Sequence, residues 1–437
     1  MPTDYRGPAV FGFESDLPAS RVAMISVHTS PLASLGRADA GGMNVYIREL
    51  CCHLAPLGHQ IDIFARRVDT ETPDVTELCP GVNVITLTAG PAEPLHKDDL
   101  FPLLPEFANQ AVLSSLRRGV RYDVVHAHYW LSGWTAHLLR RYWDTPFVTM
   151  FHTTAHMKRS SGNSTVESPQ RIATERQVID LSDSLIAANP AERADLLWRQ
   201  RMRTDKVCTV PPGVDLDLFT PGDRDAARRR LGLPGDRPLV LFVGRIDPIK
   251  GIDTLVRALA DWPAGGLRPR LVLIGGDLDP GGSPTGDLAA VARQADTAGI
   301  GGDVLYLGSR PQSDLPDFYR AVDVVAVPSL YESFGLVAVE AMACGRPVVA
   351  SRAGGLAFTI EDGESGLLVP AADPAALATA LHSVVNDVTL ADRLGKAARE
   401  AAYPFSWEAV ASGISHILNR LALGHRADLC CDEEIFA

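Results

Sequence analysis

Short apolar runs alternate with helix-length segments along this 437-residue chain, and the alternation limits its fold more than any other feature. In the first half the runs are RVAMISVHT, QIDIFAR, VNVITLT, YDVVHAH, FVTMFHT and SLIAAN. In the second half they are PLVLFVGRIDPIKG, RLVLIGGD, DVLYLGS, VDVVAVPS, RPVVASR and SGLLVP. Buried parallel strands joined by right-handed helical crossovers have this alternation. The sequence therefore predicts an α/β fold with two parallel sheets.

The two halves meet at KVCTVPPGVDLDLFTPG, whose proline and glycine content is typical of a boundary. A chain of this length also exceeds one ordinary hydrophobic core. We therefore expect Rossmann-like domains over residues 21–220 and 221–403, with ligands bound in a cleft at the carboxyl ends of their strands. A helix over 404–425 is expected next, and its packing back onto the first domain is left open. Residues 1–20 and 426–437 are expected to form an extension and a tail.

Composition and charge exclude several classes of function. Hydrophobic residues make up 46% of the chain and charged residues 22%, which is typical of a globular protein. A net charge of −12 and a pI near 5.5 argue against a nucleic-acid partner, which requires a basic surface. The sequence has no run of about 18 apolar residues that would predict a transmembrane segment. Its first residues lack the basic region and the apolar region of a signal peptide. The seven cysteines are odd in number and form no C-x-x-C, so we expect reduced thiols in a cytoplasmic protein.

Two basic residues follow the apolar run that opens the second half. In VGRIDPIKG, Arg245 and Lys250 would emerge at the carboxyl end of a strand, where ligands of such folds bind. The fork of an arginine and the point charge of a lysine together suit a diphosphate. A pair of surface charges beside a turn is the other interpretation, and this segment alone does not separate the two.

The segment SLYESFGLVAVEAMACGRPVV places two glutamates, Glu332 and Glu340, eight positions apart. We expect a helix to begin near Phe334, Gly335 and Leu336, where glycine admits a ligand close to the backbone and the helix N-terminus favours an anion. Glu340 inside the helix could accept hydrogen bonds from ribose hydroxyls, and Glu332 in the loop could accept them from a sugar. Alternatively, Glu332 stabilises the helix start and Glu340 faces solvent.

A second helix that starts at glycine is expected in the first half. Gly41 and Gly42 precede the helical pattern MNVYIREL, so Gly42 is a candidate contact for an anionic donor group. A glycine pair is weak support on its own. The chain lacks the G-x-G-x-x-G pattern of dinucleotide-binding proteins and the G-x-x-x-x-G-K-[ST] pattern of ATP-binding P-loops, so neither class is expected.

Taken together, these residues resemble the family-4 retaining glycosyltransferases, whose GT-B architecture consists of two Rossmann-like domains. The resemblance covers about residues 21–420 and rests on GRIDPIKG and on the E-x7-E element. It implies that the first domain binds the acceptor and the second binds a UDP-sugar. Arg245 and Lys250 would hold the diphosphate, while Glu340 would bind the ribose and Glu332 the transferred sugar.

Within this family, the first half is similar to the inositol-phosphate N-acetylglucosaminyltransferases of mycothiol biosynthesis. The similar stretches are SVHTSPLASLGRADAGGMNVY, GPAEPLHKDDL, HAHYWLSG and RIATERQVID. The similarity implies a set of side chains that bind the acceptor phosphate, namely Lys97, Tyr129, Thr153 and Arg171. It also implies that Asn44 contacts an acceptor hydroxyl, that His152 lies near the transferred sugar, and that the backbone of Arg310 contacts the uracil.

One segment departs from that pattern. TAHMKRS replaces the lysine-bearing loop that follows Thr153 in those enzymes, and sucrose-phosphate synthases, which also accept a sugar phosphate, are similar to the chain as well. We therefore expect transfer of a hexosyl group, GlcNAc or glucose, from a UDP-sugar to inositol phosphate, with a sugar phosphate as the alternative acceptor.

The resemblance implies front-face attack, in which the departing diphosphate takes the proton of the acceptor. Arg245, Lys250, Glu332 and His152 would be the catalytic residues. No D-x-D motif stands where the diphosphate would lie, so we expect no metal and no cofactor, the UDP-sugar being a substrate. A nucleotide-sugar epimerase and a non-catalytic sensor of nucleotide sugars are the rival functions, and a homodimer is one possible assembly.

Overall fold

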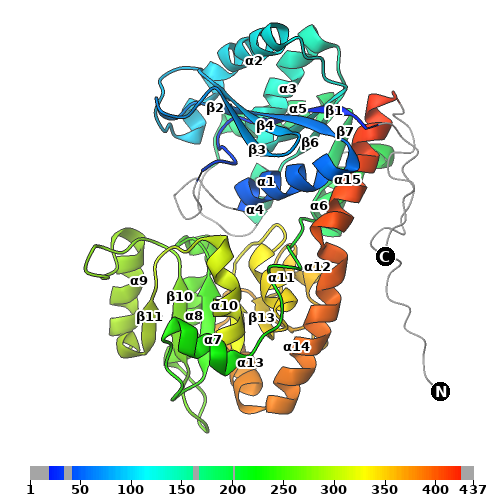
Figure 1. Ribbon diagram of the computed structural model, residues 1–437. Coiled ribbons are helices and arrows are strands. Elements are labelled where there is room, and N and C mark those ends of the chain that lie inside the picture. The colour runs from blue at the N-terminus through cyan, green and yellow to red at the C-terminus, as the bar shows by residue number, and fades with distance from the viewer. Residues whose placement is uncertain (1–18, 34–41, 161–166, 200–201, 425–437) are drawn as a thin grey trace, which may run out of the picture. The chain divides into compact units, whose positions relative to one another are not determined.

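The computed structural model describes residues 19–33, 42–160, 167–199 and 202–424 (Figure 1). The chain forms two compact units. The first comprises the described parts of Met1–Ala33, Gly42–Gly213 and Trp407–Ala437, and the second comprises Val214–Ser406.

The first unit is built on an eight-stranded sheet. Its strands are β1 (Arg21–Ser26), β2 (Gln60–Arg66), β3 (Val75–Cys79), β4 (Val82–Leu87), β5 (Val124–His128), β6 (Phe147–Met150), β7 (Ser184–Ala187) and β8 (Val207–Thr209). Their order is β3-β4-β2-β1-β5-β6-β7-β8, and every neighbouring pair is parallel except β3 with β4. In the central strand, Arg21 pairs with Gln60 of β2 and Val22 pairs with Val124 of β5.

Helices cover both faces of this sheet (Figure 1). Three of them pack through one apolar cluster onto alternate residues of β1, β4 and β5: α2 (Leu104–Arg118), α3 (Tyr129–Trp143) and α5 (Pro169–Leu181). Helices α1 (Gly42–Leu54) and α15 (Trp407–Ala422) pack against each other on the opposite face, where Tyr46 of α1 meets His128 of β5. The shorter helices are α4 (Ala155–Ser160) and α6 (Pro190–Ala194).

Helix α15 returns the end of the chain to the first unit. The buried ring of Trp407 lies 5.7 Å from the ring of Tyr46, and the absence of a side chain at Gly213 leaves room for it. Further along the helix, the Ser415 hydroxyl lies 2.7 Å from the ring of His59. The contact of Trp407 is apolar and that of Ser415 is polar, so both packing and hydrogen bonding hold α15 on this unit.

The second unit contains a six-stranded parallel sheet. Its strands are β9 (Leu239–Val243), β10 (Arg270–Ile274), β11 (Val304–Tyr306), β12 (Val324–Val327), β13 (Val348–Ser351) and β14 (Leu367–Val369). The order β11-β10-β9-β12-β13-β14 is that of a Rossmann sheet. The helices are α7 (Arg224–Leu231), α8 (Ile252–Ala260), α9 (Gly286–Thr297), α10 (Leu315–Ala321), α11 (Leu336–Ala343), α12 (Leu356–Thr359), α13 (Pro374–Asn386) and α14 (Val388–Ala402).

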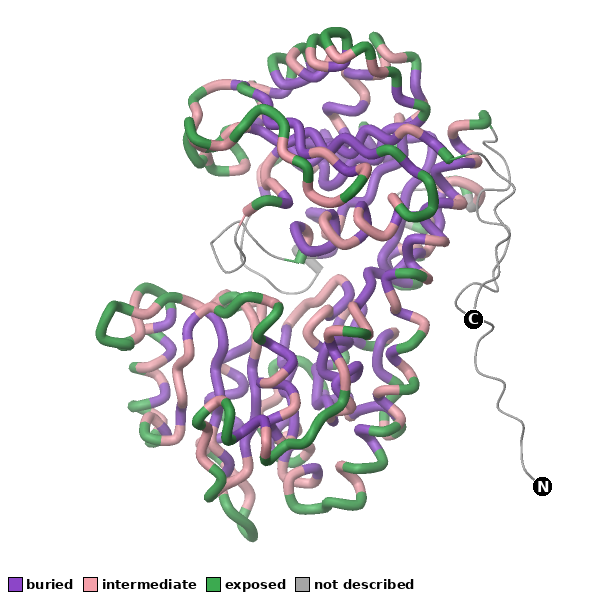
Figure 2. The backbone as a smooth tube through the Cα atoms, viewed as in Figure 1, coloured by how far each residue is buried: buried purple, intermediate pink, exposed green. Residues whose placement is uncertain are grey.

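Apart from the edge strand β3, most residues in the strands of both sheets are buried (Figure 2). In the second unit, α8, α9 and α13 pack on one face of the sheet through a cluster that includes Val240, Leu255, Leu288 and Leu381. Burial on both faces explains why these strands are continuous apolar runs in the sequence.

The predicted α/β fold with two Rossmann-like parallel sheets is confirmed, and each of the predicted apolar runs contains a strand. Two strands were not predicted. Strand β3 is a polar edge strand, VTELC, and β8 is a three-residue strand inside the proline- and glycine-rich segment. None of the described helices is long and apolar enough to cross a membrane.

The expectation of reduced thiols is wrong for three of the described cysteines, because Cys52, Cys79 and Cys208 are disulfide-bonded. Cys52 of α1 and Cys79 of β3 form a disulfide, with their Cα atoms 6.0 Å apart. They meet because α1 packs beside β3, a strand that the sequence pattern did not reveal. Cys51 and Cys344 are buried free thiols.

The turn before α8 gives a prediction about stability. Gly251 has φ +67°, and a Cβ atom there would lie 2.0 Å from the backbone oxygen of Pro328. Gly232 has φ +64°, and a Cβ atom there would have nothing within 4 Å. Gly232→Ala should cost only the left-handed strain of about 1–2 kcal/mol, whereas Gly251→Ala should cost roughly 3 kcal/mol more because backbone must move. Thermal unfolding followed by circular dichroism measures the difference, and equal losses of Tm would contradict it.

Candidate active site

In the second unit, three of the predicted ligand-binding residues lie on two loops at the point where the strand order reverses. Strands β9 and β12 are neighbours, and each is followed by a loop from its carboxyl end. The loop after β9 carries Arg245 and Lys250, and the loop after β12 carries Glu332. A backbone hydrogen bond of 2.8 Å from Leu330 to Ile249 joins the loops. Ligands of open α/β sheets bind at this position. We call Arg245, Lys250, Glu332 and Glu340 the β9–β12 cluster.

Lys250 and Glu332 form an ion pair in this cluster. The Nζ atom of Lys250 lies 2.6 Å from Oε2 of Glu332, and both side chains are mostly buried. The Ser329 hydroxyl donates a further bond of 3.3 Å to the same carboxylate oxygen. Each charge is therefore neutralised within the protein.

Arg245 and Arg310 are both exposed. The guanidinium of Arg245 lies 3.8 Å from the carboxylate of Asp247, at the outer limit of an ion pair, and half of its side chain is exposed. Arg310 lies after β11, next to Ser309, whose backbone N–H bonds to Gly276. Both cations are open to an anionic ligand, because exposed ion pairs contribute little.

Glu340 is buried, with 6% of its surface exposed, so the alternative in which it faces solvent is wrong. The Tyr319 hydroxyl donates to its Oε2 at 2.7 Å, and the Gln312 amide donates to its Oε1 at 2.9 Å. Burial raises the pKa of Glu340 to about 7, although both hydrogen bonds favour its charged form. The carboxylate changes charge near neutral pH.

Helix α11 begins close to the predicted position. Gly335 precedes it with φ +95°, and a Cβ atom at this glycine would lie 2.6 Å from Leu356. Phe334 is buried with its ring 5.3 Å from that of Phe405, so its side chain belongs to the core and only its backbone can meet a ligand. Leu336, the first residue of the helix, is half-buried.

The first unit has the corresponding reversal between β1 and β5. Gly42 begins α1 and is exposed, whereas Gly41 lies outside the described residues. Asn44 is buried, and its amide accepts a hydrogen bond from the Thr29 hydroxyl at 2.7 Å and donates one to the Ser30 carbonyl at 3.1 Å. In this structure, the Asn44 side chain therefore ties α1 to the loop that follows β1.

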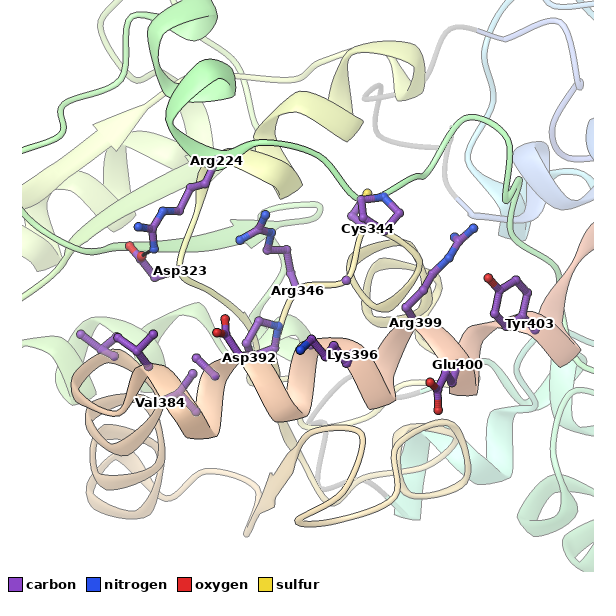
Figure 3. Close-up of a pocket in the computed structure, with 17 residues that line it drawn as sticks. Arg224, Asp323, Cys344, Arg346, Val384, Asp392, Lys396, Arg399, Glu400 and Tyr403 are labelled. Atoms are coloured by element: carbon purple, nitrogen blue, oxygen red, sulfur yellow. Dashed lines mark hydrogen bonds and ion pairs between the residues drawn. The ribbon is translucent and has the colours of Figure 1, made fainter. Parts of the chain in front are cut away.

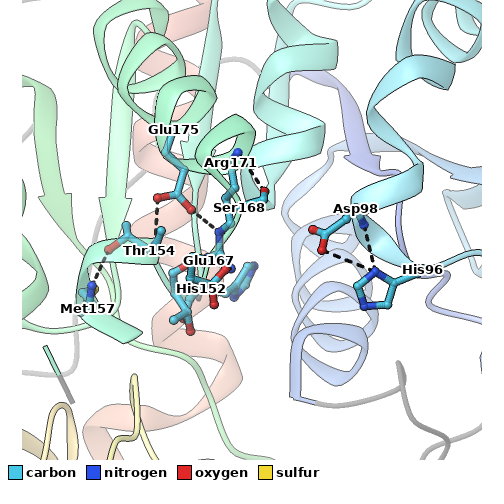
Figure 4. A network of polar contacts seen from close by, with 11 residues as sticks. His96, Asp98, His152, Thr154, Met157, Glu167, Ser168, Arg171 and Glu175 are labelled. Atoms are coloured by element: carbon cyan, nitrogen blue, oxygen red, sulfur yellow. Dashed lines mark hydrogen bonds and ion pairs between the residues drawn. The ribbon is translucent and has the colours of Figure 1, made fainter. Parts of the chain in front are cut away.

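Arg171 is the centre of a buried network in the first unit (Figure 4). Its Nη1 donates to Glu167 at 2.7 Å and its Nε donates to Glu175 at 2.6 Å. Its Nη2 donates to the backbone carbonyl of Thr153 at 2.7 Å, and its guanidinium carbon lies 5.0 Å from the centre of the Tyr129 ring. We call these five residues the Arg171 cluster. It brings together three of the four side chains that were predicted to bind the acceptor phosphate.

Lys97, the fourth, begins a short turn, Lys97–Asp99. Beside the cluster, the ring of His28 lies 4.5 Å from that of Tyr129. Burial lowers the pKa of His28 to about 3, and the positive charges of Lys97 and Arg171 lower it further. Burial also raises the pKa of Tyr129 to about 12, so this hydroxyl remains a hydrogen-bond donor.

His152 lies beside the cluster in a strained backbone. It has φ +60° and Tyr129 has φ +78°, values that residues other than glycine rarely adopt. The Nε2 atom of His152 lies 3.0 Å from Nδ1 of His128, and the Thr153 hydroxyl donates to the His152 carbonyl at 2.5 Å. Burial lowers the pKa of His152 to about 3, so the ring is neutral at physiological pH and can hold a hydrogen bond without carrying charge.

The segment that departs from the family pattern forms α4. Its start is held by Glu175, which accepts the Ala155 N–H at 2.8 Å, and by Thr154, which accepts the Met157 N–H at 3.2 Å (Figure 4). Glu175 therefore supports both Arg171 and the changed segment.

A separate pocket in the second unit has a volume of about 460 Å³ (Figure 3). Its polar lining includes Arg224, Asp323, Arg346, Lys396 and Arg399. The guanidinium of Arg399 donates to backbone carbonyls, and Arg224 pairs with Asp323 at 2.6 Å. No residue of the β9–β12 cluster lines this pocket.

Several residues that belong to the two clusters or contact them were not predicted, namely Glu167, Glu175, His28, Tyr319 and Gln312. The two glutamates lie four positions before and after Arg171, and although Glu167 precedes α5, this spacing could have indicated the ion pairs. His28, Tyr319 and Gln312 are contributed by segments far from their partners in sequence, so only the fold reveals them.

Comparison with known proteins identifies the family. Residues 40–218 match the family described as Glycosyltransferase Family 4, and residues 223–401 match the family described as Glycosyl transferases group 1. A D-inositol 3-phosphate glycosyltransferase of Kribbella flavida is 44% identical over 91% of this chain and 94% of its own length. One from Xylanimonas cellulosilytica is also 44% identical, over 90% of this chain and 95% of its own.

Among solved structures, a sucrose-phosphate synthase from Thermosynechococcus elongatus superposes with a TM-score of 0.84 at 37% identity. The match covers 92% of this chain and 99% of that one. Sequence and structure lead to the same assignment: the chain is a glycosyltransferase and belongs to the D-inositol 3-phosphate glycosyltransferase family.

Proposed function

We propose that the protein transfers a hexosyl group, GlcNAc or glucose, from a UDP-sugar to inositol phosphate with retention of anomeric configuration. The observation that carries the acceptor is the Arg171 cluster. Arg171 contacts the Tyr129 ring and the Thr153 carbonyl there. A guanidinium with hydroxyl-bearing residues beside it suits a phosphate monoester. The names of the relatives from Kribbella flavida and Xylanimonas cellulosilytica support the same acceptor.

The β9–β12 cluster supports a nucleotide-sugar donor. Two cations on the loop that follows β9 suit a diphosphate, and two carboxylates suit the hydroxyls of a sugar and a ribose. In the proposed reaction, an acceptor hydroxyl attacks the anomeric carbon on the face from which the diphosphate departs. The departing oxygen takes the hydroxyl proton. Arg245 and Lys250 stabilise the charge that builds on the diphosphate, so the reaction needs no metal and no cofactor.

A sugar phosphate is the alternative acceptor. It is supported by the likeness to a sucrose-phosphate synthase at 37% identity over almost the whole of both chains. The epimerase and sensor alternatives lose support because the family consists of transferases. A cytoplasmic location and a homodimer remain parts of the proposal. The Cys52–Cys79 disulfide does not support that location, because disulfides are rare in a reducing compartment.

Removing either cation of the β9–β12 cluster should slow transfer. Lys250→Ala and Arg245→Ala should each reduce kcat about a hundredfold to a thousandfold, because each removes a charge that stabilises the leaving group. Arg257→Ala removes an equal charge from the exposed face of α8, where Arg257 lies 3.4 Å from Asp253, and should leave kcat unchanged. Steady-state kinetics at saturating donor provide the test, and near-wild-type rates for both cluster variants would refute the donor assignment.

Glu340 should make donor binding and stability depend on pH. Its folded pKa of about 7 lies above the unfolded value of 4.5, so the folded state binds more protons between these values. The free energy of unfolding therefore falls as pH rises through this window. Glu340→Gln removes this pH dependence of stability, and it keeps both hydrogen bonds if the side-chain amide of Gln312 rotates to present its oxygen. From pH 5 to pH 8, the free energy of unfolding of the variant should rise by up to about 3 kcal/mol relative to that of the wild type.

The same carboxylate must be charged to accept strongly from ribose hydroxyls. The donor KM of the wild type should therefore rise as pH falls below about 7, and that of Glu340→Gln should be higher and independent of pH. Glu400, exposed on α14, supplies the control substitution Glu400→Gln. A wild-type donor KM that stays constant from pH 5 to pH 8 would contradict the proposed role.

The acceptor should be recognised by its phosphate. The assay contains EDTA and either UDP-GlcNAc or UDP-glucose, and it measures the rate of UDP release. This rate should be at least about tenfold lower with free inositol than with inositol phosphate, because the hydrogen bonds to the charged phosphate are lost. Fructose 6-phosphate and free fructose form the second matched pair. Release with both free compounds at the rate of their phosphates would overturn the acceptor site. Loss of activity in EDTA that is restored by Mg²⁺ would overturn the metal-free mechanism.

A further inference from the structure

Glu167 occupies Nη1 of Arg171, one of the groups to which an incoming phosphate would bind. An arginine has five N–H donors on three nitrogens, and in this structure each of the Arg171 nitrogens already donates, to Glu167, to Glu175 and to the Thr153 carbonyl. With both glutamates charged, the trio carries a net charge of −1. A phosphate monoester, which carries up to two negative charges, would be repelled from it.

The location of Glu167 is one that favours anions in general. It directly precedes Ser168, the residue that caps α5 by accepting the Arg171 N–H at 3.2 Å. The N-terminus of a 13-residue helix and the guanidinium of Arg171 attract negative charge to the same place. A carboxylate of the protein itself therefore occupies a position that suits a phosphate.

The two glutamates are not equivalent. Glu175 lies inside α5 and accepts the Ala155 N–H at 2.8 Å as well as the Arg171 Nε, so its removal would loosen α4 and Arg171 together. Glu167 lies before Ser168, the N-cap of α5, so a change in its position breaks no hydrogen bond within that helix. Of the two, Glu167 is the one that can leave.

We infer that Glu167 is an internal competitor for the acceptor phosphate: it neutralises Arg171 in the free protein and is displaced when a phosphorylated acceptor binds. Glu175 stays in place and positions Arg171. This inference rests on the proposed function for the identity of the acceptor. It adds that the protein binds phosphate more weakly than it would if Arg171 were not paired with Glu167, because binding must first separate a buried ion pair.

The inference predicts opposite effects for two matched substitutions. Glu167→Gln keeps a carbonyl oxygen for Arg171 Nη1 but removes the competing charge, so the KM for inositol phosphate should fall about tenfold with kcat little changed. Glu175→Gln makes the same chemical change but weakens the support of Arg171, so the same KM should rise. If Glu167 were merely structural, both substitutions would raise KM.

Binding of inorganic phosphate tests the inference without requiring turnover. Thermal unfolding of wild type, Glu167→Gln, Glu175→Gln and Arg171→Ala should be followed while phosphate is titrated, with chloride at matched ionic strength as the control. Glu167→Gln should be stabilised at about tenfold lower phosphate concentration than wild type. Arg171→Ala should not respond.

The outcomes separate the inference from the proposed function. A Glu167→Gln protein with unchanged or weaker phosphate binding, in a chain that does glycosylate a phosphorylated acceptor, would overturn the inference alone. Tighter phosphate binding by Glu167→Gln in a protein that transfers to no phosphorylated acceptor would support the competition and overturn the proposed function. A Glu167→Gln variant that fails to fold would also count against the inference, since it would make Glu167 a structural partner of Arg171.

Discussion

The order of parallel strands decides where chemistry can occur in this protein. In the second sheet, the chain passes from β9 to α8 and from β12 to α11, and the loops between them leave neighbouring strands at the same edge. Lys250 and Glu332 meet there because those loops are joined by backbone hydrogen bonding and by the close approach of Gly251 to Pro328. The first sheet has the same reversal, between β1 and β5. The Arg171 cluster also lies at the carboxyl ends of strands, since Tyr129 follows β5 and Thr153 comes shortly after β6.

Each cluster pairs one of its cations with a carboxylate of the protein. Lys250 is paired with Glu332, and Arg171 is paired with Glu167 and Glu175. A cation buried without a partner would cost several kcal/mol, so a site built to bind anions needs an internal anion while it is empty. The same physics that stabilises the free protein therefore limits its affinity for substrates. This balance lets a ligand exchange one set of ion pairs for another.

Much of the fold and part of the site could be predicted from the sequence. The central strands were predictable because burial on both faces makes them continuous apolar runs, whereas β3 is a polar edge strand with no such signal. Glu340 was assigned to a helix correctly, but its partners Tyr319 and Gln312 come from α10 and the turn before it. The pairing of Arg171 was missed because a charged side chain gives no sign in sequence of whether it is buried. The Cys52–Cys79 disulfide was missed because it depends on the placement of β3.

The central claim is that both clusters serve one reaction, the transfer of a hexosyl group with retention to a phosphorylated acceptor. Nuclear magnetic resonance of the products from UDP-GlcNAc and inositol phosphate tests it most directly. The account predicts a new anomeric proton signal with the small coupling constant of an α-linkage, one UDP for each glycoside formed, and an intact phosphate monoester on the acceptor. A β-linked product, or UDP released with free sugar and no glycoside, would contradict it.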